Sequence, residues 1–174
     1  MPFELQPTLT GELVQLRPLR VEDFQELYSV ASDPGVWEQH PVSDRYEEDV
    51  FRGFFREAIE SGGAFAVVER ASGRIIGSSR YYGFDEQRRE IEIGWTFLAR
   101  AYWGGVYNRE MKALMLNHAF RFVDAVIFLV GRQNWRSQRA LEKIGGVRID
   151  ETRERAGHQH VIFRITKADA HLPD

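Results

Sequence analysis

The chain has 174 residues, of which 43% are hydrophobic and 28% are charged, and its formal net charge is −3. This length suits one domain spanning residues 1–174, and the mixed charges argue against general binding to nucleic acid or an anionic membrane. Cysteine is absent, which excludes disulfides, a thiolate nucleophile and cysteine metal sites. The sequence contains no secretory pattern and no run of about 18 apolar residues, so we expect a soluble, cytoplasmic protein.

The first third of the chain predicts one strand and two helices. Residues 13–17 alternate between apolar and polar side chains and stop at Pro18, which is typical of a strand. Apolar residues then recur at helical spacing over 21–31, until Asp-Pro-Gly at 33–35 breaks the pattern. The same spacing returns over 46–59, which predicts the second helix.

The middle of the chain predicts three antiparallel strands. Residues 64–70 and 74–82 are joined by Ala-Ser-Gly at 71–73, which is typical of a hairpin. A third strand at 90–98 extends the meander. Within it, Glu90 and Glu92 share one face, so they belong either to a solvated sheet surface or to a catalytic site.

The last third predicts two helices and three strands. A helix over 108–123 has an apolar face and Asn108 as a cap, and the helix at 135–144 ends at Gly145. The apolar run 125–130 has the length of a buried strand and is parallel to the strand before it, because a helix connects them. Two final strands are expected at 146–155 and 160–166. The order βααβββαβαββ predicts an α/β or α+β fold with one central mixed sheet flanked by helices.

The loop before the 108–123 helix has the composition of a phosphate site. Gly104 and Gly105 allow a ligand to approach the backbone, and the first amides of a helix are unpaired and lie at the positive end of its dipole. Arg109 and Lys112 occupy the start of the helix, where acidic residues are more common. A tight turn without a ligand would also explain the two glycines.

Three segments together resemble the GNAT superfamily of acyl-CoA-dependent N-acetyltransferases. They are the strand 90–98, the loop 102–108 and the segment 134–146. The loop is similar to the Trp-Gly-x-Gly-Tyr-Ala-x-Glu pattern of the Rim-type (RimJ/RimL) ribosomal-protein acetyltransferases. It matches this pattern at Trp103, Gly104, Tyr107 and Glu110, and departs from it at Val106 and Asn108.

The resemblance implies the GNAT fold and a site for acetyl-CoA. In that family the strands corresponding to 90–98 and 125–130 separate, and the pantetheine arm inserts between them as an added strand. A backbone N–H near Trp95 or Thr96 would hold the thioester carbonyl. The implied cofactor-binding residues are Trp95, Thr96, Trp103, Gly104, Gly105, Val106, Tyr107, Asn108, Arg109, Asn134 and Arg139.

The resemblance also assigns catalytic and acceptor residues. Ser137 would lie near the thioester sulfur, and Glu92 would take the proton from the amine, directly or through water. Trp37 and His40 fall in the region that shapes the acceptor pocket. Asn134 is explained equally well as a plain helix cap.

We therefore expect an acetyl-CoA-dependent N-acetyltransferase that acts on a primary amine without a covalent enzyme intermediate. The amine could belong to a protein N-terminus, a polyamine or an aminoglycoside-like molecule. A non-catalytic acyl-CoA-binding module and a longer acyl donor remain alternatives, and a homodimer remains open. His118 lies on an apolar helix face and is expected in the core. No third ligand is suitably spaced from His158 and His160, so we expect no metal.

Overall fold

This computed structural model describes residues 2–171. Its strands form one eight-stranded sheet in the order β1-β2-β3-β4-β5-β6-β8-β7. Every neighbouring pair is antiparallel except β5 and β6, which are parallel as expected. The strands are β1 (Leu9–Thr10), β2 (Val14–Pro18), β3 (Ala64–Glu69), β4 (Ile75–Asp85), β5 (Glu90–Leu98), β6 (Ala125–Gly131), β7 (Val147–Arg155) and β8 (His158–Thr166). The helices are η1 (Val21–Asp23), α1 (Phe24–Ala31), α2 (Pro34–Trp37), α3 (Glu48–Ser61), η2 (Arg100–Tyr102), α4 (Val106–Ala119) and α5 (Trp135–Lys143).

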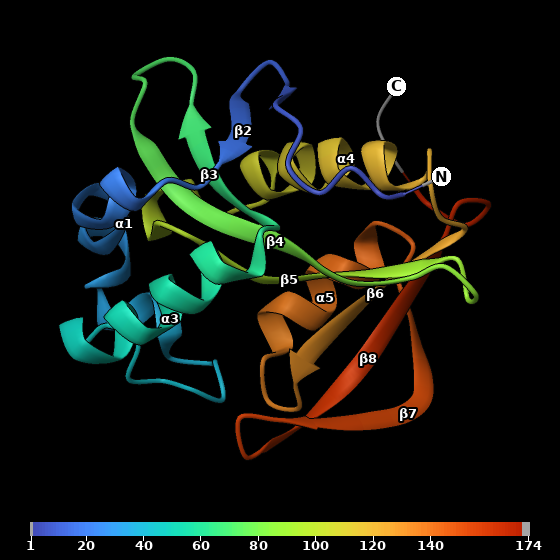
Figure 1. Ribbon diagram of the computed structural model, residues 1–174. Coiled ribbons are helices and arrows are strands. Elements are labelled where there is room, and N and C mark those ends of the chain that lie inside the picture. The colour runs from blue at the N-terminus through green and yellow to red at the C-terminus, as the bar shows by residue number, and fades with distance from the viewer. Residues whose placement is uncertain (1, 172–174) are drawn as a thin grey trace.

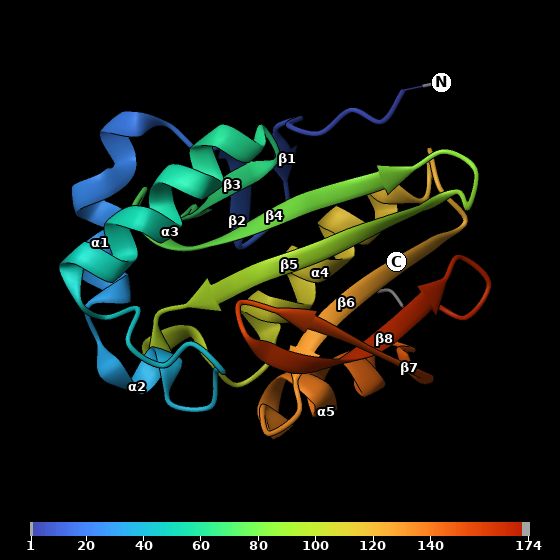
Figure 2. The same cartoon turned by 60° about the horizontal axis from the view of Figure 1, so that its bottom comes forward.

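Helices cover both faces of the sheet. Helices α1 and α3 lie on one face, and α4 and α5 lie on the other (Figures 1 and 2). Each face has its own core: Phe51 and Phe55 of α3 pack in one, and Met111 and Met115 of α4 pack in the other. Because both faces are covered, residues 64–67 of β3 are all buried rather than alternately exposed. No helix within residues 2–171 is both long and apolar enough to cross a bilayer.

Three short elements were not expected from the sequence: β1, α2 and η2. β1 adds a strand at the edge of the sheet beside β2. Helix α2 begins at the Asp-Pro-Gly sequence that we expected only to end a helix. The Asp33 side chain accepts a hydrogen bond from the Gly35 N–H, and Pro34 occupies the first turn, where its missing N–H costs nothing.

The start of α4 also differs from the expectation. The helix begins at Val106, and Gly105, rather than Asn108, is the residue that precedes it. Gly104 and Gly105 have φ values of 109° and 117°, which a side chain would disfavour, so the two glycines provide the sharp entry into the helix. Asn108 therefore lies within the first turn.

The sheet opens between β5 and β6. Their parallel pairing runs from Glu90 opposite Ala125 to Glu92 opposite Ile127, and then stops. Beyond this point β6 continues to pair with β8, whereas β5 continues beside β4. The seam between the two strands is therefore held at one end and open at the other (Figure 2).

A carboxylate ties the start of the sheet to α4. Glu110 accepts hydrogen bonds from the backbone N–H groups of Glu12, Leu13 and Val14 at 2.6, 2.8 and 2.8 Å. A Cβ on Gly11 would come within 2.5 Å of the Glu110 carboxyl carbon. The turn between β1 and β2 is thus shaped around this one side chain.

Candidate active site

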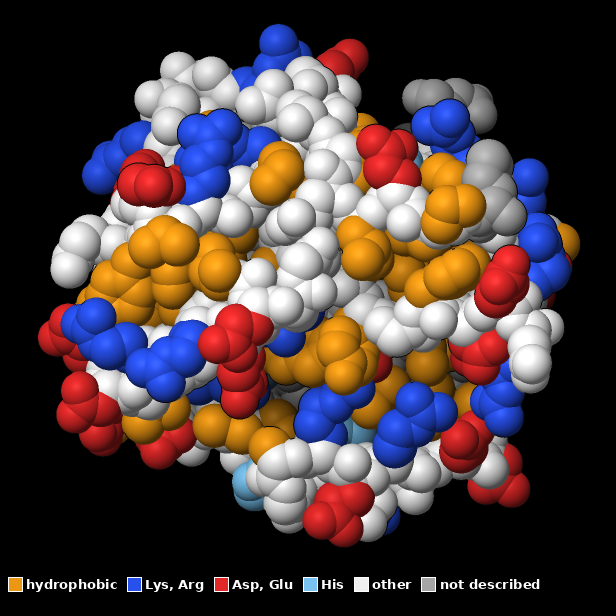
Figure 3. Space-filling model, in the orientation of Figure 1, with side chains coloured by type: hydrophobic (Ala, Val, Ile, Leu, Met, Phe, Trp, Pro, Cys, Tyr) orange, Lys and Arg blue, Asp and Glu red, His pale blue; other side chains and the backbone are white. Residues whose placement is uncertain are grey.

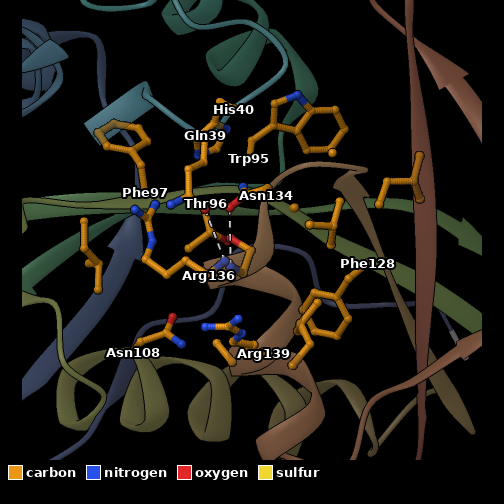
Figure 4. A pocket seen from close by; sticks show the side chains of 18 of the residues that line it. Gln39, His40, Trp95, Thr96, Phe97, Asn108, Phe128, Asn134, Arg136 and Arg139 are labelled. Atoms are coloured by element: carbon orange, nitrogen blue, oxygen red, sulfur yellow. Dashed lines mark hydrogen bonds between the residues drawn. The ribbon is translucent and has the colours of Figure 1, made fainter. Parts of the chain in front are cut away.

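A cleft of about 550 Å³ lies where β5 and β6 separate. Its walls come from the diverging ends of these strands, the starts of α4 and α5, the loop after α2 and the turn between β7 and β8. On the face seen in Figure 3, Lys, Arg and apolar side chains gather around a hollow below the centre of the molecule. Figure 4 shows Gln39, His40 and Trp95 at one end of the cleft and Asn108 and Arg139 at the other.

The charges in the cleft all have the same sign. Although the whole chain has a net charge of −3, no Asp or Glu contributes to the part of the cleft wall formed by residues 39–160. A concave site with only cations attracts anionic ligands. The cationic side chains in the wall are Arg45, Arg109, Lys112, Arg136, Arg139, Lys143 and Arg155.

One end of the cleft is the glycine loop. The first backbone bond inside α4 runs from the Arg109 N–H to the Gly105 carbonyl at 2.8 Å, so the amides before Arg109 have no partner within the helix. A Cβ on Gly104 or Gly105 would meet no atom within 4 Å, so space remains in front of the backbone. With Arg109 beside it, this end of the cleft suits a phosphate group.

The loop residues predicted to bind the cofactor separate into two groups. Trp103, Gly104, Gly105, Asn108 and Arg109 line the cleft. Two others do not. The Val106 side chain is 58% exposed outside the wall, and the Tyr107 hydroxyl donates to Glu69 Oε2 at 3.2 Å. For Val106 and Tyr107, therefore, the structure leaves only the backbone amides as possible contacts.

A β-bulge forms the middle of the cleft. Ser79 of β4 opposes both Trp95 and Thr96 of β5, and Trp95 has a φ of 53°. Such a bulge leaves a backbone group outside the ladder, which suits an N–H that holds a substrate carbonyl. The Thr96 hydroxyl binds Ser79 Oγ at 2.8 Å and accepts from Lys112 Nζ at 2.9 Å. Burial lowers the pKa of Lys112 to about 7.

Helix α5 borders both ends of the cleft. Asn134 caps it, as the sequence suggested, by accepting a bond from the Ser137 N–H at 3.4 Å, and Asn134 also lines the cleft beside Ser137 and Arg139. The Arg136 guanidinium lies 3.6 Å from the centre of the Trp103 ring, and the Arg136 N–H donates to the side chain of Gln39.

Glu92 lies behind the cleft wall, in an ion pair. Its two carboxylate oxygens accept from Arg155 at 2.6 and 2.7 Å, and the residue is 4% exposed. Glu90 pairs similarly with Arg164 at 3.2 Å. A solvated sheet face is therefore the wrong explanation for these carboxylates. The role of Glu92 as a proton acceptor stays a prediction, and the structure gives it a positional role toward Arg155.

Of the two residues expected at the acceptor end, His40 and Trp37, only one lines the cleft. His40 lines the cleft, and burial, followed by repulsion from Arg45, lowers its pKa to about 3, so it is neutral at physiological pH. Trp37 is 1% exposed, and its indole N–H donates to the Ala31 carbonyl. Trp37 belongs to the core rather than to the cleft wall. His118 also lies in the core, as expected, with its Nε2 bonded to the Glu4 carbonyl.

Several residues of the cleft were missed by the sequence analysis. Arg45 comes from the loop after α2, and Arg155 from the end of β7. Arg155 directly precedes the expected Ala-Gly turn, which placed it near a hairpin tip. Nothing in the sequence indicated that this tip reaches β5.

The open seam and the glycine loop at a helix start define the acetyltransferase class of folds. The family model described as "Acetyltransferase (GNAT) domain" matches residues 14–147, and the chain belongs to this family. Acetyl transfer is the general reaction of the family, whose members use acetyl-CoA as co-substrate.

Known relatives agree with this assignment. The chain is 25% identical over 139 residues to the "Uncharacterized N-acetyltransferase YnaD" of Bacillus subtilis, covering 79% of this chain and 81% of that protein. A solved GCN5-related N-acetyltransferase from Brucella melitensis shares the fold with a TM-score of 0.85 at 20% identity, covering 97% and 82% of the two chains. A putative ribosomal-protein-serine acetyltransferase from Vibrio cholerae shares it with a TM-score of 0.76 at 14% identity, covering 93% and 98%.

Proposed function

We propose that this protein is an acetyl-CoA-dependent N-acetyltransferase that acetylates a primary amine by direct attack on the thioester. The observation that carries this proposal is the continuous basic cleft. It begins at the glycine loop, follows the open seam between β5 and β6, and ends around His40. An extended anionic donor and a separate acceptor can therefore meet near the bulge at Trp95.

The donor would be held along the seam. The amides at the start of α4 suit a pyrophosphate, and Arg109 and Arg139 suit the phosphate oxygens. The pantetheine arm would lie between β5 and β6, where backbone groups beyond Glu92 are free of the ladder between these two strands. Asn134 would contact its amides.

The transfer needs the attacking amine and two protein groups around the thioester, one at its carbonyl oxygen and one at its sulfur. The amine nitrogen attacks the carbonyl carbon, the carbon–sulfur bond breaks, and the sulfur leaves as a thiolate. A backbone N–H of the bulge at Trp95 or Thr96 would hold the carbonyl oxygen. Ser137 would donate a hydrogen bond to the sulfur, and a thiol with a pKa of about 8.5 needs little further help to leave.

Removal of the proton from the amine favours an α-amine as acceptor. At pH 7, deprotonating a lysine side chain costs roughly 4 to 5 kcal/mol, whereas a peptide α-amine costs roughly 1 kcal/mol. Among the described residues the cleft holds no strong free base, because Glu92 is paired with Arg155, the pKa of His40 is about 3 and that of Lys112 is about 7. The structural neighbour from Vibrio cholerae is described as a ribosomal-protein-serine acetyltransferase, which is consistent with a protein α-amine as acceptor.

Two measurements test the proposal together. Calorimetric titration with CoA and acetyl-CoA should show binding, and thiol release from acetyl-CoA should appear with at least one α-amine in a panel of amines. Absence of binding at millimolar CoA would refute the donor assignment. Binding without release across the panel would instead support a non-catalytic acyl-CoA-binding module, and faster release from a longer acyl-CoA would change the donor.

A further inference from the structure

Three arginines alternate with aromatic rings at the end of the cleft opposite the glycine loop. The Arg45 guanidinium lies 4.9 Å from the ring centre of Phe54, and the Arg80 guanidinium lies 5.7 Å from the same ring. Arg80 and Arg155 both contact Trp95, at 4.2 and 4.3 Å from its ring centre. We call Arg45, Arg80 and Arg155 the arginine ladder. Arg45, Arg155 and Trp95 line the cleft itself.

Only one member of the arginine ladder, Arg155, has an ion-pair partner among the described residues. Arg155 pairs with Glu92, but Arg80 is only 4% exposed and its Nε and Nη2 atoms have no hydrogen-bond partner within residues 2–171. In the same part of the chain, neither a hydrogen bond nor an ion pair joins Arg45 to another side chain. Glu57 attracts both residues from the surface of α3, Asp44 also attracts Arg45, and Glu92 also attracts Arg80. None of these carboxylates forms an ion pair with Arg45 or Arg80 within residues 2–171.

Burying the charged guanidinium groups of Arg45 and Arg80 destabilises the fold unless an anion compensates their charge. Burial lowers the pKa values of Arg45 and Arg80 to about 10, so both guanidinium groups stay charged at neutral pH. Contact with an aromatic face stabilises a cation by about 0.5 to 2 kcal/mol, whereas removing an ion from water costs several kcal/mol. The missing compensation is an anion with the geometry that a guanidinium prefers, which is a carboxylate or a phosphate.

The donor does not supply this anion. Its phosphates would lie at the glycine loop, where Arg109, Arg139 and Lys143 line the other end of the cleft. Nor is the whole ladder needed to hold the β7–β8 hairpin, because β8 pairs with β6 from Ala125 to Gly131 and Arg155 pairs with Glu92. The acceptor amine is the remaining ligand that reaches this end.

Resting on the proposed function, we infer that the acceptor is a small primary amine that carries a carboxylate or phosphate within a few bonds of the amine. Arg45 and Arg155, the two members of the ladder that line the cleft, would bind this anion, and the charge of the buried Arg80 would add to the attraction. The amine would thereby be placed beside the bulge at Trp95. Polyamines and other polycations would be repelled from the same end of the cleft.

Matched acceptors test the inference directly. Amino acids would be compared with their own α-amides as acceptors, using glycine, serine, glutamate and phenylalanine, and aminomethylphosphonate would represent the phosphate-like arm. A free carboxylate raises the pKa of the neighbouring amine, so chemistry alone favours the amide. We expect kcat/KM to be about tenfold or more higher for the acid form of at least one pair. Higher kcat/KM for every amide, or for spermidine, would overturn the inference.

Arginine variants locate the effect. Arg45→Gln should reduce the ratio of acid to amide kcat/KM by about tenfold or more. Arg109→Gln, the matched change at the donor end, should raise the KM of acetyl-CoA and leave this ratio unchanged. An unchanged ratio in Arg45→Gln would contradict the assignment of Arg45. If Arg45→Gln does not fold, Arg45→Lys, which keeps the charge but cannot form the two parallel hydrogen bonds of a guanidinium, tests the same ratio.

Binding separates this inference from the proposed function. With CoA present, the N-acetylated amino acids and their amides can be titrated as unreactive products, followed by thermal melting. Stabilisation by the acids and not by the amides supports an anion site even if the protein shows no turnover with any amine. Equal stabilisation by both would refute the anion site while leaving acetyl transfer intact.

Discussion

Replacing Lys112 should make the protein more stable near neutral pH. Lys112 is 6% exposed, and its amine has Thr96 as its hydrogen-bond partner. Burial lowers its pKa from 10.5 to about 7 in the fold, whereas the unfolded chain keeps the ordinary value. Between these two values only the unfolded state binds the proton, so stability rises with pH across this interval. Below about pH 7 the folded state must carry the buried charge.

The expected magnitude follows from the same pKa values. At 1.36 kcal/mol per pKa unit, the difference between the unfolded and folded pKa values of Lys112 corresponds to about 5 kcal/mol of unfolding free energy. Because the amine also lines a cleft that water can enter, we expect a measured effect of about 2 to 4 kcal/mol. Lys112→Met fills a similar volume without a charge. Its advantage over wild type should be greatest at about pH 6.5 and should shrink toward pH 9.5.

Urea unfolding at several pH values between about 6.5 and 9.5 measures this difference. Other groups with shifted pKa values, such as His40 and Tyr81, are present in both proteins and cancel in the comparison. Lys167→Met, a change at an exposed lysine, is the matched control and should show no such trend. A stability difference between Lys112→Met and wild type that is constant over this range would refute the lowered pKa.

Three further changes test the cleft. Gly105→Ala introduces a side chain at a φ of 117° and should cost about 1 to 2 kcal/mol and reduce the melting shift produced by CoA, because the amides of α4 would turn. Ser137→Ala should lower kcat while leaving CoA affinity within a few-fold, and unchanged kcat would make Ser137 only part of the helix start. Glu92→Gln weakens the hold on Arg155 and should destabilise by about 1 to 3 kcal/mol in urea unfolding. If Glu92 is also the proton acceptor, the acidic limb of the kcat/KM profile should move in Glu92→Gln but not in Glu90→Gln, the matched change on the same strand.

The sequence predicted the elements with strong local patterns. Strand β5 was placed at its observed limits of Glu90 and Leu98, because alternation and flanking polar residues mark both ends. Helix α2 was missed because Asp33 and Pro34 follow the end of one helix and also begin the next. The same residue types are common just after a helix and at the start of one, so the sequence does not distinguish the two cases. Asn108 was taken as a cap because the unusual φ of Gly105 cannot be read from its identity.

The donor end of the cleft was easier to predict than the acceptor end. The residues of the glycine loop and of the Asn134 segment are contiguous, so a local motif identifies them. The arginine ladder joins a loop, β4 and β7, which are far apart in the sequence and meet only through the order of strands in the sheet. Glu92 alternates with apolar residues as surface residues do, and Arg80 follows two serines, so only the folded chain shows that both are buried.

The contact between Glu110 and the β1–β2 turn has a consequence for protein engineering. Glu12 and Leu13 are exposed, so a designer would regard this turn as a place to insert a peptide tag or a reporter domain. The turn, however, holds the first half of α4 in position through three backbone N–H groups. An insertion there would tilt the glycine loop and weaken donor binding. The turn at 86–88 between β4 and β5 is equally exposed and is the more permissive site.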